Sequence, residues 1–240
     1  MKKKRLFVDS GKRRGTVILN WHGTPEKEFT YFAESFRLLA QESVAALRKN
    51  REFGLDGTPL EDFKAYPVVF LYRHALELYM KAILLVGSPM LELKGGATVD
   101  RERVLTIHNL DVLRQDVERV FEAFGWKWDL GSPHFQTVKD LRAVIGEFHS
   151  VDQGSYAFRY PLDTKGGASL QVAFQFNLFD FCEILDDLLE TLEGAAIGAH
   201  YKLDDAMREI GEAQQAELEN STYEYEVEVY ENHFDPQEEF

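Results

Sequence analysis

The chain of 240 residues contains a single cysteine, Cys182, which lies within an apolar stretch. One thiol cannot build a disulfide framework, and a zinc site that needs several cysteines is disfavoured for the same reason. This sparing use of cysteine fits a reducing cytoplasm. The basic start, residues 1–5, is followed by only three apolar residues before Asp9, so the apolar core of a secretory signal peptide is missing. We therefore expect a cytoplasmic protein.

Glycine-rich phosphate-binding motifs are also missing from the sequence. Neither a Walker-type phosphate loop nor the glycine fingerprint of a dinucleotide-binding fold occurs, and we expect no cofactor. The acidic group Asp186, Asp187 and Glu190 has the spacing of a solvated helix face, so we expect no metal site there.

The longest strongly apolar segment, residues 66–86, is interrupted by four polar side chains near its centre, namely Arg73, His74, Glu77 and Lys81. These make insertion into a bilayer costly, so we expect no membrane association. The segment is apolar nearly all round at helical spacing, which predicts a helix at the centre of a bundle. Arg73, Glu77 and Lys81 are spaced i, i+4 and i+8 and can pair along one face. For Glu77 and Lys81 we expect a structural ion pair between bundle helices.

The net charge of −14 is concentrated at one end of the chain. Residues 204–240 hold thirteen acids against one base, while residues 1–203 hold 28 acids and 26 bases. The first fourteen residues carry seven bases and one acid. The near-neutral balance of residues 1–203 and the acidic arm disfavour a strong nonspecific RNA binder, because phosphate contacts need clustered bases. The acidic arm could engage a basic partner protein.

Apolar residues at helical spacing predict an all-α bundle of about five helices. The predicted helices cover residues 24–49, 66–86, 108–124, 132–148 and 178–192, and the last of them could continue to about residue 219. The first begins after the cap Thr24, the second ends at Gly87, and the fourth is capped by Ser132 and Pro133.

Minor β pieces are expected at the two ends of the chain. Residues 16–21 are β-like between glycines, and residues 222–230 alternate strictly between polar and apolar side chains, which is a strand pattern. We predict a basic arm over residues 1–23, a helical bundle over residues 24–200 and an acidic extension over residues 201–240.

Three segments in this order resemble the HEPN superfamily: Tyr72–Leu84, His108–Leu113, and the stretch from Val151 to Pro161. HEPN proteins are helical bundles of prokaryotic toxins, anti-phage systems and some CRISPR nucleases, and the similarity covers residues 60–195. The resemblance implies a HEPN-like bundle in a bacterial defence or toxin–antitoxin system. Active members cut RNA without a metal, at a composite site in a homodimer, with one arginine and one histidine a few residues apart.

Arg142 and His149 are the catalytic pair that this resemblance implies. Arginine holds the scissile phosphate in a fixed fork, and histidine exchanges protons near neutral pH. The two residues are seven apart, about two helical turns, so their side chains project from one face. Ala143 departs from the polar residue that usually follows the arginine in active members. Pairing His108 with Arg101 or Arg103, seven and five residues before it, is an alternative.

Four further side chains are candidates for binding substrate or phosphate: Arg73, His74, His108 and Arg159. Each also has a structural interpretation. His74 can be a core histidine with one satisfied nitrogen, and His108 with Asn109 can cap a helix start. Arg159 can clamp a phosphate, or it can tie an irregular loop to a carboxylate such as Asp152 or Asp163.

Two functions follow from these observations. The first is a HEPN-like protein that cleaves RNA as a metal-independent ribonuclease, with RNA and a second copy of the chain as partners. The second is a catalytically inactive HEPN-like module for protein assembly, nucleotide sensing or regulation. The acidic arm of residues 201–240 favours the second function as the role of the chain ends, because the arm could engage a basic partner.

Overall fold

The protein folds as a bundle of helices in the computed structural model, which describes residues 16–19, 25–52, 59–127, 132, 134–170 and 175–233. Within these residues there are six helices and no strand, and the only β contact is an isolated bridge between Leu162 and Ala168. The helices are α1 (Pro25–Glu52), α2 (Pro59–Leu93), α3 (Arg101–Thr106), α4 (Leu110–Phe124), α5 (Val138–Val151) and α6 (Leu178–His233). The predicted all-α class is confirmed for this part of the chain.

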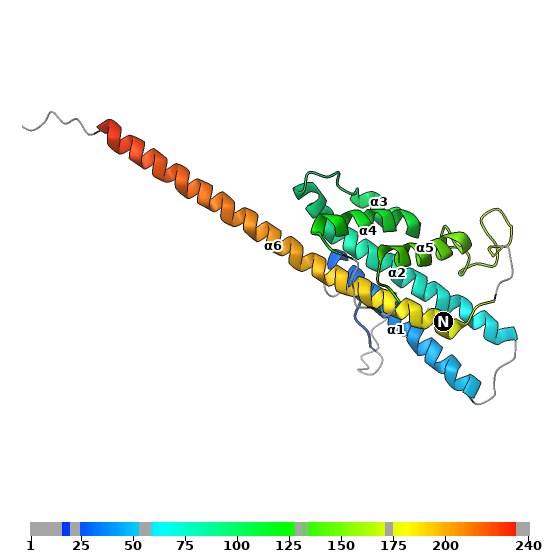
Figure 1. Cartoon of the computed structure of the whole chain (residues 1–240). Coiled ribbons are helices and arrows are strands. Elements are labelled where there is room, and N and C mark those ends of the chain that lie inside the picture. The colour runs from blue at the N-terminus through cyan, green and yellow to red at the C-terminus, as the bar shows by residue number, and fades with distance from the viewer. Residues whose placement is uncertain are drawn as a thin grey trace, which may run out of the picture.

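Helix α2 is the centre of the bundle. It packs against α1, α3, α4 and α6, which surround it (Figure 1). Its fully buried apolar side chains include Tyr72, Ala75, Leu76, Tyr79, Met80, Ile83 and Leu84. The helix is apolar nearly all round because neighbours cover nearly all of its surface.

The C-terminal end of α2 differs from the prediction. The helix begins at Pro59 and runs through Pro67, and it continues past Gly87 to Leu93. Gly87 has another role, because a Cβ atom there would lie 2.3 Å from Cγ1 of Val120 on α4. The missing side chain therefore lets α4 approach α2 closely, and the glycine does not end the helix.

Helices α4 and α5 each begin at a polar cap. The Asn109 side chain accepts hydrogen bonds from the backbone N–H groups of Asp111 and Val112. Helix α5 begins after Thr137, five residues beyond the predicted cap at Ser132. The Ser132 hydroxyl instead accepts the backbone N–H of Phe135, 2.9 Å away, in a turn before the helix.

The acidic end of the described chain is helical. Residues 222–230 belong to α6, so the predicted strand is wrong. Alternating side chains make a strand only where a neighbouring strand accepts the backbone hydrogen bonds, whereas a helix satisfies its own. Thr16–Leu19 is exposed and irregular, and residues 20–21 of that predicted strand lie outside the described residues.

Helix α6 packs on α1 and α2 with its first half and then extends well beyond the other helices (Figure 1). Among the described residues, no helix combines the length and the apolar character needed to cross a membrane.

Candidate functional site

A cluster of mostly buried polar side chains lies between α2 and the segments that follow α3 and α5. It consists of Arg73, Glu77, Lys81, His108 and Asp152, and we call it the polar centre. The first three project from α2 at 0%, 1% and 4% exposure, and Asp152 is 5% exposed. Groups of this kind are rarely buried unless they are paired, so their partners decide what the cluster does.

Along α2, Glu77 bridges the two cations. Its Oε2 lies 3.2 Å from Nη1 of Arg73, and its Oε1 lies 3.0 Å from Nζ of Lys81. The row of ion pairs that the i, i+4, i+8 spacing indicates is therefore present. It joins residues of one helix, whereas the sequence-based interpretation placed the pair of Glu77 and Lys81 between helices.

The two cations also hold neighbouring segments onto α2. Nη2 of Arg73 donates to the carbonyl oxygen of His108 at 2.8 Å, and Nζ of Lys81 donates to that of Leu105 at 3.1 Å. Nε of Arg73 lies 3.2 Å from Oδ2 of Asp152, an ion pair whose N–H is not aimed at the oxygen. The segments that contain Arg73, His108 and Asp152 thus meet at one place.

The polar centre is balanced in charge, with Arg73 and Lys81 against Glu77 and Asp152. Burial acts to raise the pKa of Glu77, but the attraction of Lys81 and hydrogen bonds from Lys81 and His108 outweigh it and lower that pKa. Burial lowers the pKa of Arg73, against the attraction of Asp152 and Glu77. Glu77 therefore stays ionised at neutral pH.

His108 is the member of the polar centre that reaches solvent. Its side chain is 55% exposed, and Nδ1 lies 2.9 Å from Oε1 of the buried Glu77. Because an ionised carboxylate only accepts, the ring proton belongs on Nδ1, which leaves Nε2 free to take a proton. A histidine oriented in this way by a carboxylate can act as a general base or acid.

The segment after α5 is folded around Asp152. Oδ1 of this residue accepts the backbone N–H groups of Tyr156 and Ala157 at 2.8 and 3.2 Å. Ser155 is buried with a φ of 65°, a left-handed conformation that is uncommon outside glycine. The carboxylate of Asp152 thus fixes a tight loop on one side and contacts Arg73 on the other.

Arg159 does not make the carboxylate tie that the sequence suggests. Asp152 is engaged by Arg73, and Asp163 accepts the backbone N–H groups of Lys165 and Gly167. Nε of Arg159 donates instead to the carbonyl oxygen of Ser155. The guanidinium lies over the rings of Phe70, Tyr156 and Tyr160, 5.3 to 5.6 Å from their centroids, which are cation–π distances.

His74 has the surroundings of a core histidine. Its ring meets Phe36 edge-on at 4.5 Å and stacks on Phe70 at 5.6 Å between centroids. Burial is the main cause that lowers its pKa, so the neutral ring is favoured in the folded protein.

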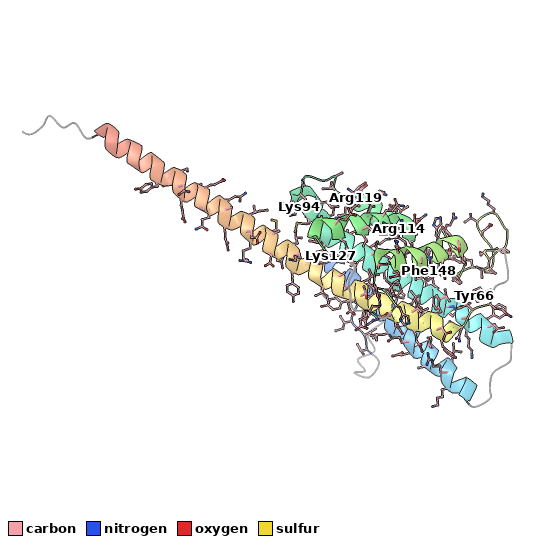
Figure 2. All side chains as sticks on the ribbon, in the orientation of Figure 1. Tyr66, Lys94, Arg114, Arg119, Lys127 and Phe148 are labelled. Atoms are coloured by element: carbon pink, nitrogen blue, oxygen red, sulfur yellow. The ribbon has the colours of Figure 1, made fainter. Side chains whose placement is uncertain are left out.

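The predicted catalytic pair faces α4 from α5. Arg142 donates to Glu118 from Nε at 3.0 Å and from Nη2 at 2.6 Å, a bidentate ion pair. Glu118 also receives a hydrogen bond from Arg114, which lies on α4 where α4 meets α5 (Figure 2). His149 is half-buried, and its Nδ1 is buried without a hydrogen-bond partner. The pKa of the Asp111 carboxyl is lowered chiefly by its hydrogen bond from Arg114, with His149 among the smaller causes.

The spacing of seven residues therefore does place Arg142 and His149 on one side of α5. Their neighbours Glu118 and Asp111 are also seven apart, on the adjacent α4. Sequence reasoning missed Glu118. The available signal was its distance of seven residues from Asp111, which equals the distance between Arg142 and His149. It also missed the contact between Arg73 and Asp152, which no local spacing indicates.

In the described part of the chain, no group of three or more histidine, cysteine, aspartate or glutamate side chains is arranged to hold a metal ion. Comparisons with protein-family models, curated proteins and solved structures find no match for this chain.

Proposed function

We propose that this chain is a HEPN-like protein of a bacterial defence or toxin system that acts as a catalytically inactive module for assembly, nucleotide sensing or regulation. Support for the family comes from the polar centre, because all three segments of the resemblance contribute charged groups or backbone to it. Such a centre, buried and charge-balanced, holds a helical bundle together without needing a substrate.

The ion pair of Arg142 with Glu118 is the observation that favours an inactive module. A scissile phosphate would have to displace the carboxylate of Glu118, which already binds both Nε and Nη2. Glu118 is itself held by Arg114, and its pKa is lowered because hydrogen bonds from Arg142 and Arg114 outweigh the effect of burial. A carboxylate that stays ionised competes with phosphate for this arginine at neutral pH.

Metal-independent cleavage of RNA is the second candidate, and His108 is the observation that favours it. The imidazole is exposed, and the buried Glu77 orients it for proton transfer at Nε2. In this candidate the phosphate-binding arginine comes from elsewhere, either Arg159 or a second copy of the chain in a homodimer.

Cleavage of labelled RNA in EDTA by purified protein separates the candidates. The proteins are the wild type, Arg142→Ala, His149→Ala and His108→Ala, with Arg208→Ala on the outer part of α6 as a matched control. We expect no cleavage by any of them. Cleavage that is lost only in His108→Ala supports the second candidate. Cleavage that is lost in both Arg142→Ala and His149→Ala restores the catalytic pair and refutes the inactive module.

A further inference from the structure

The outer half of α6, residues 201–233, extends beyond the bundle (Figure 1). Four large apolar side chains on this half are more than half exposed: Tyr201, Met207, Leu218 and Tyr223. Leu203, Met207, Ile210 and Leu218 fall within about a quarter of the helix circumference at 3.6 residues per turn. The outer half therefore combines an apolar row with a strongly acidic sequence.

A bare helix of this composition is poorly stabilised in water. Most helical stability in proteins comes from packing of an apolar face, which the outer half does not have within the described bundle. Asp205 and Glu209 are like charges at i, i+4, which destabilise a helix. The ion pairs of Arg208 with Asp205 and Glu212, 3.2 and 3.5 Å long, are exposed and contribute little. The outer half thus favours a partner that supplies both positive charge and apolar surface.

The chain itself contains a segment of the required chemistry. Residues 1–14 carry seven bases and one acid, and Leu6, Phe7 and Val8 lie between the two groups of bases. A second copy of α6 is a poor partner by comparison, because residues 204–240 hold thirteen acids against one base in every copy.

The start of α1 lies toward the point where the outer half of α6 leaves the bundle. Arg48 pairs with Glu183 at 2.7 Å and Arg37 with Glu193 at 3.4 Å, so α1 and α6 run antiparallel. Moving from Arg37 toward Pro25 therefore corresponds to moving along α6 past Glu193, toward the point where it leaves the bundle. The 24 residues before α1 can span up to about 80 Å when extended, and residues 201–233 of α6 span about 50 Å.

We infer that residues 1–14 dock along the outer half of α6 in the same chain. The bases lie against the acids of the helix, and Leu6, Phe7 and Val8 cover the apolar row that includes Leu203 and Met207. This contact occupies the acidic surface that would otherwise receive a basic partner. It depends on neither candidate function, because neither involves residues 1–14.

The test is energy transfer within the full chain. Fluorophores are attached to Ser10→Cys and Ser221→Cys, and an excess of unlabelled protein suppresses transfer between chains. Cys182 is buried, which raises the pKa of its thiol to about 12, so it does not compete for the label. We expect a high-transfer population at low salt that falls at least about threefold when salt screens the charges. The pair Ser10→Cys and Ser150→Cys, with one label on α5, is the reference.

A second test removes negative charge from the outer half of α6 and compares it with the same loss of charge elsewhere. Glu209→Gln, Glu212→Gln and Glu217→Gln together should remove most of the high-transfer population. Three exposed acids elsewhere, Glu92, Glu102 and Glu147, changed to glutamine give the same net charge and should leave it intact. The inference would be overturned if both triple variants lost the high-transfer population equally. It would also be overturned if the Ser10–Ser221 pair showed the same transfer as the reference pair, or if transfer occurred only between separately labelled chains.

Discussion

Changing Glu77 to glutamine tests whether the polar centre stabilises the fold through balanced charge. The substitution keeps the shape of the side chain and removes one negative charge. In the wild type this carboxylate faces Arg73 at 3.2 Å, Lys81 at 3.0 Å and His108 at 2.9 Å, and it is 1% exposed. After the change, the polar centre holds two buried cations and one buried carboxylate, Asp152, which contacts Arg73.

The expected loss is large because the remaining charges stay buried. Removing one partner of a buried ion pair typically costs about 3–5 kcal/mol, most of it the desolvation of the charge left behind. Such a loss is a considerable part of the stability of a typical domain, which is about 5–15 kcal/mol. Adding Lys81→Met restores the charge balance between Arg73 and Asp152, so the double variant should be more stable than Glu77→Gln alone.

Urea unfolding followed by circular dichroism and tryptophan fluorescence measures these free energies. The control is Asp205→Asn, which breaks an exposed pair with Arg208 on α6 and should leave the unfolding midpoint unchanged. A loss below about 1 kcal/mol in Glu77→Gln, or a double variant less stable than the single one, would refute the charge-balance reasoning.

Three further outcomes are expected. The pKa of Glu77 is lowered below its ordinary 4.5, so its contribution to stability is present above that pH and is lost as the pH falls through the folded pKa. As the pH is lowered below 4.5, wild type should therefore lose more stability than Glu77→Gln in urea titrations. Gly87→Ala should lower the melting temperature, at a cost of about 1–3 kcal/mol, because its Cβ would lie 2.3 Å from Cγ1 of Val120, and Val120→Ala should recover part of the loss. Asn109→Ala should cost about 1 kcal/mol in urea unfolding, since two backbone N–H groups of α4 lose their cap; a neutral effect would mean that water replaces it.

The class of fold and the central helix could be predicted from the sequence because they depend on local periodicity. Residues 66–86 are apolar nearly all round, and the structure surrounds α2 with four other helices. The ends of helices were predicted less well. Gly87 resembles a helix stop in the sequence, but its lack of a side chain serves the contact with Val120, which depends on tertiary packing.

The candidate site was predictable only within single helices. The row of Arg73, Glu77 and Lys81 follows from their spacing on α2. The partners from other segments do not, because Asp152 contacts Arg73 across 79 positions of the chain. The same limit applies to Arg142, whose spacing from His149 indicates a common face but not that Glu118 occupies that face.

His108 differs from the other members of the polar centre in what its loss would do. Arg73, Glu77, Lys81 and Asp152 are buried charges, so removing any of them disturbs the balance of the core. His108 is 55% exposed, and without its ring Glu77 still faces both cations of α2. His108→Ala should therefore unfold close to wild type while losing the imidazole that this carboxylate orients. A loss of RNA cleavage in that variant would then report chemistry, whereas the same loss in Glu77→Gln would not distinguish chemistry from folding.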